Sequence, residues 1–348
     1  MSKRLILQMF QQKVTDIIEQ LDKVKEQGFS YIQITPVQPT KEYNWEFWSV
    51  YQPISFSRIG NQYCKDENEL KKLCDKAHNK GLKIIVDVVF GHVASKNNCY
   101  YEPHELVDGE LKNPYFFKTK EKVRSWEDRW QCTNLNYGLP CFDWKNYDLH
   151  EIELNFLKKL VDLGADGFRL DALKHCSTEE DNHFFKRVVN KIKEYKSDLL
   201  IYGEVIFTQH NIIDEYISKG INVLTTNGAT DRSKLVTFID SHDMLYEFKI
   251  TKNYTKEIIC NEWQVLINDK TTRYNIFYVR PSREYLDKYF GIKEGRIPYE
   301  GSDSFKIDTF DETWKSEEIR IINLEGKNDS INCMDIINYN SSCTCKSI

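Results

Sequence analysis

Residues 164–175 read GADGFRLDALKH, and this stretch decides the fold. A run of apolar residues at helical spacing leads into it, and Gly164 is the kind of residue that ends a helix. The residues that follow predict a short buried strand with Arg169 and Asp171 at its carboxyl end. Side chains two positions apart in a strand point to the same face, so these opposite charges are expected to lie together. A guanidinium holds a neighbouring carboxylate ionised, as a nucleophile requires, but a purely structural ion pair explains the stretch equally well.

Strand and helix signals alternate regularly on both sides of this stretch. The expected strands cover residues 5–10, 31–34, 82–89, 167–171, 199–204, 221–224, 235–240 and 274–279. The expected helices cover residues 14–25, 67–80, 149–163, 179–195, 211–218 and 254–267. Eight strands with intervening helices predict an α/β fold, the (β/α)8 or TIM barrel. The link between the sixth and seventh strands is too short for a full helix.

The alternation lapses in two places, which divide the chain. Residues 93–147 hold turn residues and aromatics without a clean period, and we expect a loop or small second domain inserted after the third strand. Residues 1–92 and 148–290 are expected to form the barrel. The polar residues 291–348 are expected to form a C-terminal extension.

The composition excludes several classes of protein. The 348 residues carry a net charge of −5 without a basic block, so a nucleic-acid partner is not expected. No apolar run approaches the roughly 18 residues of a membrane span. Ten cysteines lie without paired-motif spacing, and the N-terminus lacks a signal-peptide pattern, so we expect reduced thiols and a cytoplasmic location. The 13% aromatic content suits sugar binding, but aromatic rings also fill cores.

Four short motifs carry a resemblance to a known family. GFRLDALKH at 167–175 resembles the strand-four motif of the α-amylase family of glycoside hydrolases. DVVFGH at 87–92, GEV at 203–205 and FIDSHD at 238–243 resemble three more of its motifs, in the family's order. Each motif ends an expected strand, where the active sites of TIM barrels lie. The resemblance implies a TIM barrel with a small domain inserted after strand three.

Two further comparisons refine the resemblance. Residues 48–53 match the form W-x-x-Y-Q-P, which is typical of the animal-like branch of α-amylases. The family usually adds a C-terminal β-sandwich domain, and too few residues follow the expected barrel for one. The chain is therefore predicted to be a C-terminally truncated member.

The carboxylates at the strand ends are the candidates for catalysis. Breaking a glycosidic bond requires one carboxylate to attack the anomeric carbon and one carboxylic acid to protonate the leaving oxygen. By resemblance, Asp171 is the nucleophile, Glu204 the general acid/base and Asp243 the third carboxylate, which stabilises the transition state. Arg169 would keep Asp171 charged, and the apolar neighbours of Glu204 suit an acid. Each carboxylate taken alone could be a structural ion pair or helix cap, and Asp87 is expected to be structural.

Other matched positions are expected to contact the sugar. His92 and His242 match histidines that hydrogen-bond the ring in the cleaved subsite, although a single histidine is usually structural. Tyr51 is expected to stack under the same ring. The remaining expected substrate-binding residues are Trp48 and Gln52 at the next sugar inward, Arg169, and Lys174 and His175 on the leaving-group side.

Ion sites of the family are altered in this sequence. Its structural Ca²⁺ uses an Asn, an Asp of the second domain and a His carbonyl, and calcium prefers six to eight oxygen ligands. Here Gly91 replaces the Asn and Asn134 replaces the Asp, which leaves the His175 carbonyl. We therefore expect a weak or absent Ca²⁺ site, with Asn134 and His175 as residual candidates. Ser241 replaces an Asn used for chloride activation, so chloride dependence is not favoured.

The function predicted from the sequence is α-amylase activity. The enzyme would cleave internal α-1,4-glucosidic bonds of starch- or glycogen-type glucans with retention, and its partner would be the glucan. An α-glucan transglycosylase carries the same residues, and a catalytically idle glucan-binding protein is the alternative from another class. The oligomeric state is left open.

Overall fold

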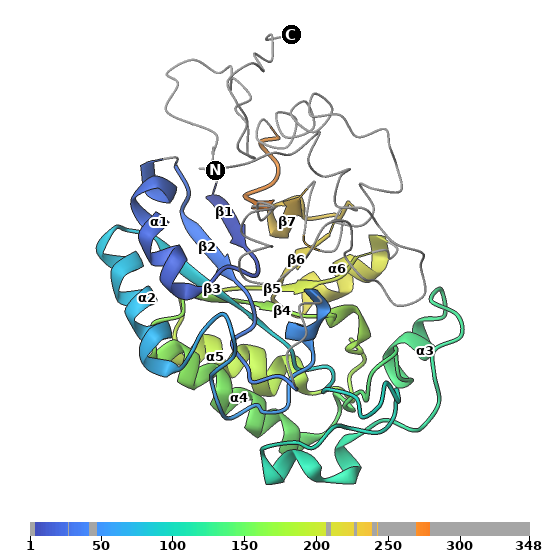
Figure 1. The fold of residues 1–348 in the computed structure, drawn as a ribbon. Helices are drawn as coiled ribbons and strands as arrows, with labels where there is room; N and C mark the ends of the chain where they lie inside the picture. The colour runs from blue at the N-terminus through green and yellow to red at the C-terminus, as the bar shows by residue number, and fades with distance from the viewer. Residues whose placement is uncertain are drawn as a thin grey trace, which may run out of the picture.

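Eight parallel strands close into a barrel in chain order, as predicted (Figure 1). The computed structural model describes residues 4–26, 28–41, 47–206, 210–225, 228–238, 242 and 269–278. The strands are β1 Arg4–Met9, β2 Tyr31–Ile34, β3 Lys83–Val88, β4 Gly167–Leu170, β5 Leu200–Glu204, β6 Asn222–Leu224, β7 Leu235–Phe238 and β8 Tyr274–Tyr278. Pairing of β1 with β8, with Arg4 opposite Tyr274, closes the barrel.

Most helices begin and end where the sequence indicates. Their bounds are α1 Val14–Glu26, α2 Glu67–Asn79, α3 Arg129–Asn134, α4 Tyr147–Asp162, α5 Asn190–Tyr195 and α6 His210–Ser218. The Asp66 side chain caps α2, and the Asn146 side chain caps α4. Gly164 follows α4 with a φ of +108°, the left-handed conformation that glycine adopts readily. No helix among the described residues is long and apolar enough to cross a membrane.

One expected helix differs in the structure, and another lies outside the described residues. The helix expected over residues 179–195 begins only at Phe184, because the buried Asn182 side chain accepts a hydrogen bond from the Phe184 N–H. Its first turns form the π-helix η5, Phe185–Val189, which leads into α5. The short helix α3 was not expected, and the Asp128 side chain caps it. The expected helix 254–267 and the extension 291–348 lie outside the described residues.

The barrel interior changes from apolar to polar along the strands. Ile6, Ile85 and Leu200 pack together inside the barrel. Asp87 lies two residues beyond Ile85 toward the carboxyl end of β3, and it is paired there with Arg169 of β4. The helix-facing residues of the strands pack against the helices in a separate core. Burial on both faces explains why the strands read as near-continuous apolar runs. The polar layer places the candidate chemistry at the carboxyl ends.

The segment between β3 and α4, residues 93–146, lies beside the barrel and contributes none of its strands; below it is called the insert. It holds α3 and the turns η2 Gly109–Lys112 and η3 Pro114–Phe116. Its Asp108 carboxylate accepts hydrogen bonds from Ser55 and Ser57, which follow β2. A link between the sixth and seventh strands without a full helix was expected, and in its described residues the turn η6, Arg232–Lys234, is the one helical element.

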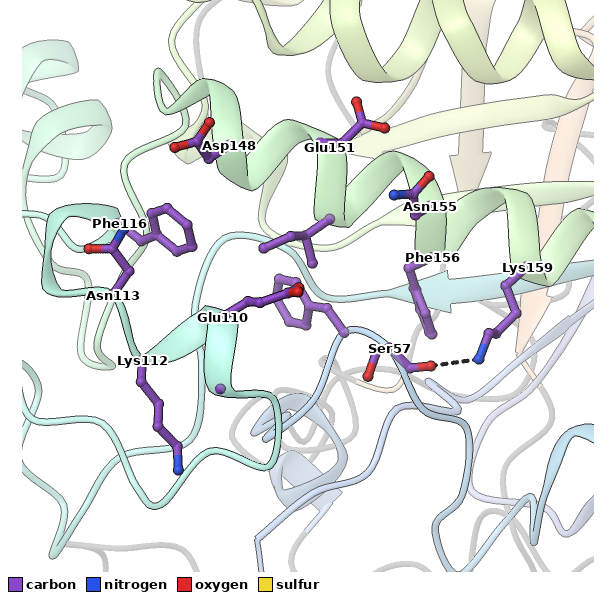
Figure 2. A pocket seen from close by; sticks show the side chains of 13 residues that line it. Ser57, Glu110, Lys112, Asn113, Phe116, Asp148, Glu151, Asn155, Phe156 and Lys159 are labelled. Atoms are coloured by element: carbon purple, nitrogen blue, oxygen red, sulfur yellow. Dashed lines mark hydrogen bonds between the residues drawn. The ribbon is translucent and has the colours of Figure 1, made fainter.

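The insert, α4 and the residues that follow β2 line an open cavity of about 970 Å³ (Figure 2). Its lining includes Asp148, Glu151 and Asn155 of α4, and Glu110 and Lys112 of η2. Among the predicted site residues that the structure describes, none lines this cavity. The candidate chemistry therefore lies elsewhere, at the strand ends.

Candidate active site

One buried arginine binds three carboxylates at the carboxyl end of the barrel. Arg169 is 1% exposed. Its Nη1 donates to Asp87 at 3.0 and 3.1 Å and to Asp171 at 2.7 Å. Its Nη2 lies 2.6 Å from Glu204 Oε1. The structure thus brings together four of the residues that the sequence singled out, from β3, β4 and β5.

The charges in this cluster do not balance. Three carboxylates share one guanidinium, so the fully ionised cluster carries excess negative charge in a buried place. Burial raises the pKa of the Asp87 carboxyl to about 6, although Arg169 and the Tyr51 hydroxyl favour its charged form. The carboxylates raise the pKa of Arg169 well above its ordinary value, although burial opposes this. Like charges in one site titrate together, and such a cluster tends to retain one proton.

The turn after β4 places Asp171 and Glu204 on the two sides of the guanidinium. The Asp171 N–H donates to the Val88 carbonyl at 3.0 Å, which extends the strand pairing by one residue. Ala172 then takes a left-handed φ of +48°, and its N–H donates to Glu204 Oε2 at 2.9 Å. The Leu173 side chain fills the space beside Gly203, where a Cβ would collide with it. This turn and β5 are therefore fitted closely to each other.

A second cluster joins Tyr51, His242 and Gln8. The Tyr51 hydroxyl donates to Asp87 Oδ2 at 2.9 Å and lies 2.6 Å from His242 Nε2. The Gln8 amide nitrogen donates to His242 Nδ1 at 2.9 Å, so Nε2 carries the proton and donates to Tyr51. The Phe10 ring stacks on His242 at 4.2 Å. Burial holds the pKa of His242 well below its usual range, so its imidazole is neutral.

His92 joins the site to the insert. Its Nε2 donates to the Tyr51 carbonyl at 2.6 Å, and its Nδ1 accepts from the Tyr137 hydroxyl at 2.9 Å. Burial lowers the pKa of His92 to about 4. Two of the expected sugar contacts lie near this part of the chain. Gln52 is buried, and Trp48 is half-buried with the Lys41 ammonium 5.8 Å from its ring centroid.

The turn η4, Leu173–His175, carries the last two predicted contacts. His175 is 3% exposed, donates from Nδ1 to the Cys132 carbonyl at 2.8 Å and stacks on Tyr137 at 3.9 Å. The structure packs His175 between barrel and insert, and its contact with the substrate stays a prediction. Lys174 Nζ lies 5.7 Å from the Trp126 ring centroid. Asp243 and Ser241 lie outside the described residues.

The model of the α-amylase catalytic domain matches residues 13–279. The chain belongs to the α-amylase family of glycoside hydrolases. An α-amylase of Clostridium acetobutylicum is 30% identical over 213 residues, which are 58% of this chain and 28% of that protein. An α-amylase of Butyrivibrio fibrisolvens is 24% identical over 92% of this chain and 38% of its own length. The matched region is thus well under two thirds of either relative.

Solved structures agree on the fold of the α-amylase family. The cyclomaltodextrin glucanotransferase CldA superposes with a TM-score of 0.67 at 19% identity, over 80% of this chain and 71% of its own. Identity this low supports the shared barrel alone. Both the family and the TIM barrel predicted from the motifs are therefore confirmed.

The family's structural calcium ion does not fit the residues present. A side chain at Gly91 would collide with the Tyr137 hydroxyl and approach the Trp144 ring to 3.0 Å, so an aromatic pair fills the space of the missing ligand. The Asn134 amide nitrogen donates to the Trp130 carbonyl at 2.9 Å. The Lys118 ammonium lies 5.8 Å from the centroid of the Tyr137 ring, and a cation there opposes calcium. No cluster of three or more metal-ligating side chains occurs in the described part of the chain.

Several members of the site had no signal in the sequence. Tyr137 lies in the irregular insert, and Gln8 lies in an apolar strand whose partner His242 is distant in the chain. The one available signal for Gln8 was its position on the inward face of an expected barrel strand. Contacts of Arg169 with Glu204 and Asp87 were likewise not foreseen, because they depend on the register of three strands.

Proposed function

We propose that this α-amylase family member is a retaining, endo-acting enzyme that cleaves internal α-1,4-glucosidic bonds of starch- or glycogen-type glucans. The observation that carries the proposal is the binding of Asp171 and Glu204 to the two terminal nitrogens of Arg169. Carboxylates held on one guanidinium are close together. A short separation favours direct attack on the sugar, because it leaves no room for a water between carboxylate and anomeric carbon.

Each residue then has a role that follows from its surroundings. Asp171, held by Arg169, attacks the anomeric carbon and forms a glycosyl-enzyme, while Glu204 protonates the departing oxygen. Glu204 next takes a proton from water, which attacks the glycosyl-enzyme and releases Asp171. Asp243 is proposed as the third carboxylate.

The sugar-contacting roles are proposals of the same kind. His92 and His242 are held neutral. They are proposed to contact the sugar hydroxyls, and such a contact would have to replace the present hydrogen bonds from His92 Nε2 to the Tyr51 carbonyl and from His242 Nε2 to the Tyr51 hydroxyl. The Tyr51 ring, fixed by Asp87 and His242, is the proposed platform under the cleaved sugar.

The first test is release of reducing ends from soluble starch by the parent and by Glu204→Gln. The substitution keeps the shape of the side chain but removes the proton donor, so the rate should fall roughly a hundredfold to ten-thousandfold. Glu194→Gln, on the exposed side of α5, serves as the matched control and should retain full activity. Equal rates in Glu204→Gln and the parent would overturn the assignment of Glu204.

Two further readouts address the finer points. NMR of the first product should show the α-anomer, and an initial β-anomer would contradict retention. Chromatography of maltoheptaose digests should show shorter products. Products longer than maltoheptaose would favour the transglycosylase alternative, and binding without any cleavage would favour the idle glucan-binding protein. The cytoplasmic location stays a prediction.

A further inference from the structure

Gln8 is a polar side chain on the inner face of a largely apolar strand. β1 reads RLILQM, and Ile6, two positions before Gln8, packs inside the barrel. Side chains two positions apart in a strand point to the same face, so Gln8 also points inward. It is 4% exposed, and burial of an amide is unfavourable unless the amide forms hydrogen bonds. Its position therefore depends on the partner that it finds there.

The partner of Gln8 is His242. The amide nitrogen donates to Nδ1 of the imidazole at 2.9 Å, across 234 positions of the chain. Within the described ranges, the amide oxygen of Gln8 has no hydrogen-bond partner. The His242 ring is 3% exposed and also stacks on Phe10, which follows β1. β1 and the residue directly after it therefore hold this ring by a hydrogen bond and by stacking.

The direction of the hydrogen bond is set from the other side of the imidazole. An ionised carboxylate only accepts, so the hydrogen of the Tyr51 hydroxyl goes to Asp87 Oδ2 at 2.9 Å. The Tyr51 oxygen then accepts from His242 Nε2 at 2.6 Å. Because the imidazole is neutral, a hydrogen on Nε2 leaves a lone pair on Nδ1. Nδ1 therefore needs a donor, and the Gln8 amide supplies it.

The proposed sugar contact removes one of these two constraints on the imidazole. A sugar hydroxyl that binds His242 Nε2 would displace the Tyr51 hydroxyl from that nitrogen. Because a sugar hydroxyl both donates and accepts, it does not fix which imidazole nitrogen carries the hydrogen. The contact of Gln8 is on the opposite ring nitrogen, so it is compatible with a bound sugar.

We propose that Gln8 is a positioning residue for glucan cleavage: its hydrogen bond to Nδ1 keeps the hydrogen of His242 on Nε2, where the imidazole donates to a sugar hydroxyl. The inference rests on the proposed function. Gln8 acts through His242 rather than on the reacting atoms. Gln8→Met leaves Nδ1 without a donor, and Gln8→Glu sets an acceptor against it once the carboxyl is ionised.

Gln33 offers a matched control on the neighbouring strand. It is paired with Gln8 in the register of β1 and β2, and it is 1% exposed. Its amide oxygen accepts from the Tyr202 hydroxyl of β5 at 2.6 Å. The two glutamines thus share residue type and burial, but the hydrogen bond of Gln33 goes to a tyrosine. Gln33→Met removes that bond and leaves the Gln8 contact with His242 in place.

The first part of the test measures kcat/KM for maltoheptaose between about pH 5 and pH 8. Gln8→Met keeps the length of the side chain without the donor. It should lower kcat/KM roughly tenfold at every pH, about the loss of one hydrogen bond. Gln33→Met should stay close to the parent.

Gln8→Glu adds a signature that a packing defect does not imitate. Its carboxyl and the histidine Nδ1 share one proton, so the next proton of the pair is the one on Nε2. That proton is bound in acid and lost as the pH rises, so kcat/KM relative to the parent should recover as the pH falls. Among the described residues, the charged groups that act on His242 are Arg169, which adds to burial in lowering its pKa, and Asp87 beyond Tyr51. Both are the same in every variant, so the ratio isolates residue 8.

Nitrogen NMR of isotope-labelled histidines observes the imidazole directly, and His242→Gln assigns its signal. At neutral pH the parent and Gln33→Met should carry a hydrogen on Nε2 and none on Nδ1. Gln8→Glu should carry a hydrogen on Nδ1. A change in packing alone would leave the hydrogen on Nε2.

The outcomes separate this inference from the proposed function. If the parent releases no reducing ends from maltoheptaose, the proposed function fails, and the role of Gln8 in it fails too. If the parent is active but Gln8→Met and Gln33→Met lose equally, or Gln8→Glu keeps a bare Nδ1, the Gln8 inference alone is overturned. A ratio for Gln8→Glu that stays constant with pH also contradicts it. Thermal unfolding midpoints establish that each variant is folded, and Gln8→Glu decides alone if Gln8→Met does not fold.

Discussion

Three histidines at the catalytic face are neutral for one physical reason. Burial lowers the pKa of His92, His175 and His242, because each would have to carry its charge away from water. The unfolded chain has no such restriction and takes up protons near pH 6.5. Acid therefore favours the unfolded state. Above pH 6.5 the three histidines do not lower the free energy of unfolding, and below pH 6.5 they lower it progressively as the pH falls.

We expect His92→Gln to reduce the dependence of stability on pH. For His92 the loss runs from about pH 6.5 down to its folded pKa of about 4, and it amounts to about 3 kcal/mol. The free energy of unfolding, measured with urea at pH 7 and pH 4.5, should fall more in the parent than in His92→Gln. Asp87 acts with the opposite sign, because its raised pKa makes the folded state relatively more stable in acid. Parallel pH profiles of the two proteins would contradict this account of His92.

An aromatic stack is one of the contacts that join the insert to the barrel. Tyr137 contacts His92 through its hydroxyl and His175 through its ring face. Its ring and Trp144 occupy the space beside Gly91, the position at which the resemblance would have required a calcium-binding Asn. Tyr137 thus connects the insert to the barrel directly, through ring packing and the hydrogen bond of its hydroxyl to His92.

This element predicts independence from calcium. Exhaustive chelation should change neither the unfolding midpoint nor starch cleavage, whereas Tyr137→Ala should cost about 3–5 kcal/mol of stability, the usual range for a large core truncation. Tyr115→Ala is the control, because that ring lies in the same insert and is 85% exposed. Loss of activity on chelation that Ca²⁺ alone restores would show that calcium holds the junction after all.

At the scale of the whole molecule, closure of the barrel depends on close approach of neighbouring strands. A Cβ at Gly167 would collide with the Leu200 carbonyl oxygen of β5, and backbone cannot move aside cheaply. A Cβ at Gly109, in the insert, would meet no atom within 4 Å.

Gly167→Ala should therefore destabilise the protein by several kcal/mol, on the order of a core overpacking defect or more, while Gly109→Ala should be nearly neutral. Thermal unfolding of the two variants measures the difference. Circular dichroism shows whether Gly167→Ala retains the barrel at all. Equal midpoints would mean that β4 and β5 can separate without penalty.

The sequence predicted the parts of the molecule that depend on local pattern. Apolar runs marked all eight strands, and the spacing of Arg169 and Asp171 predicted their contact. The start of the helix at Phe184 was missed, since one side chain, Asn182, overrides the helical pattern there. The contact of Arg169 with Glu204 was missed because it requires the pairing register of two strands. Ring packing around Gly91 leaves no sequence signal.

The pairing of β1 with β8 has a consequence for synthesis. β1 begins at Arg4 and its partner β8 begins at Tyr274, so the first strand leaves the ribosome long before its neighbour exists. At about 5–20 residues per second, the nascent chain waits on the order of tens of seconds with one sheet edge unpaired. Such edges invite aggregation. Chaperones that cover the N-terminal strand during translation should therefore raise the yield of this protein more than chaperones added after release.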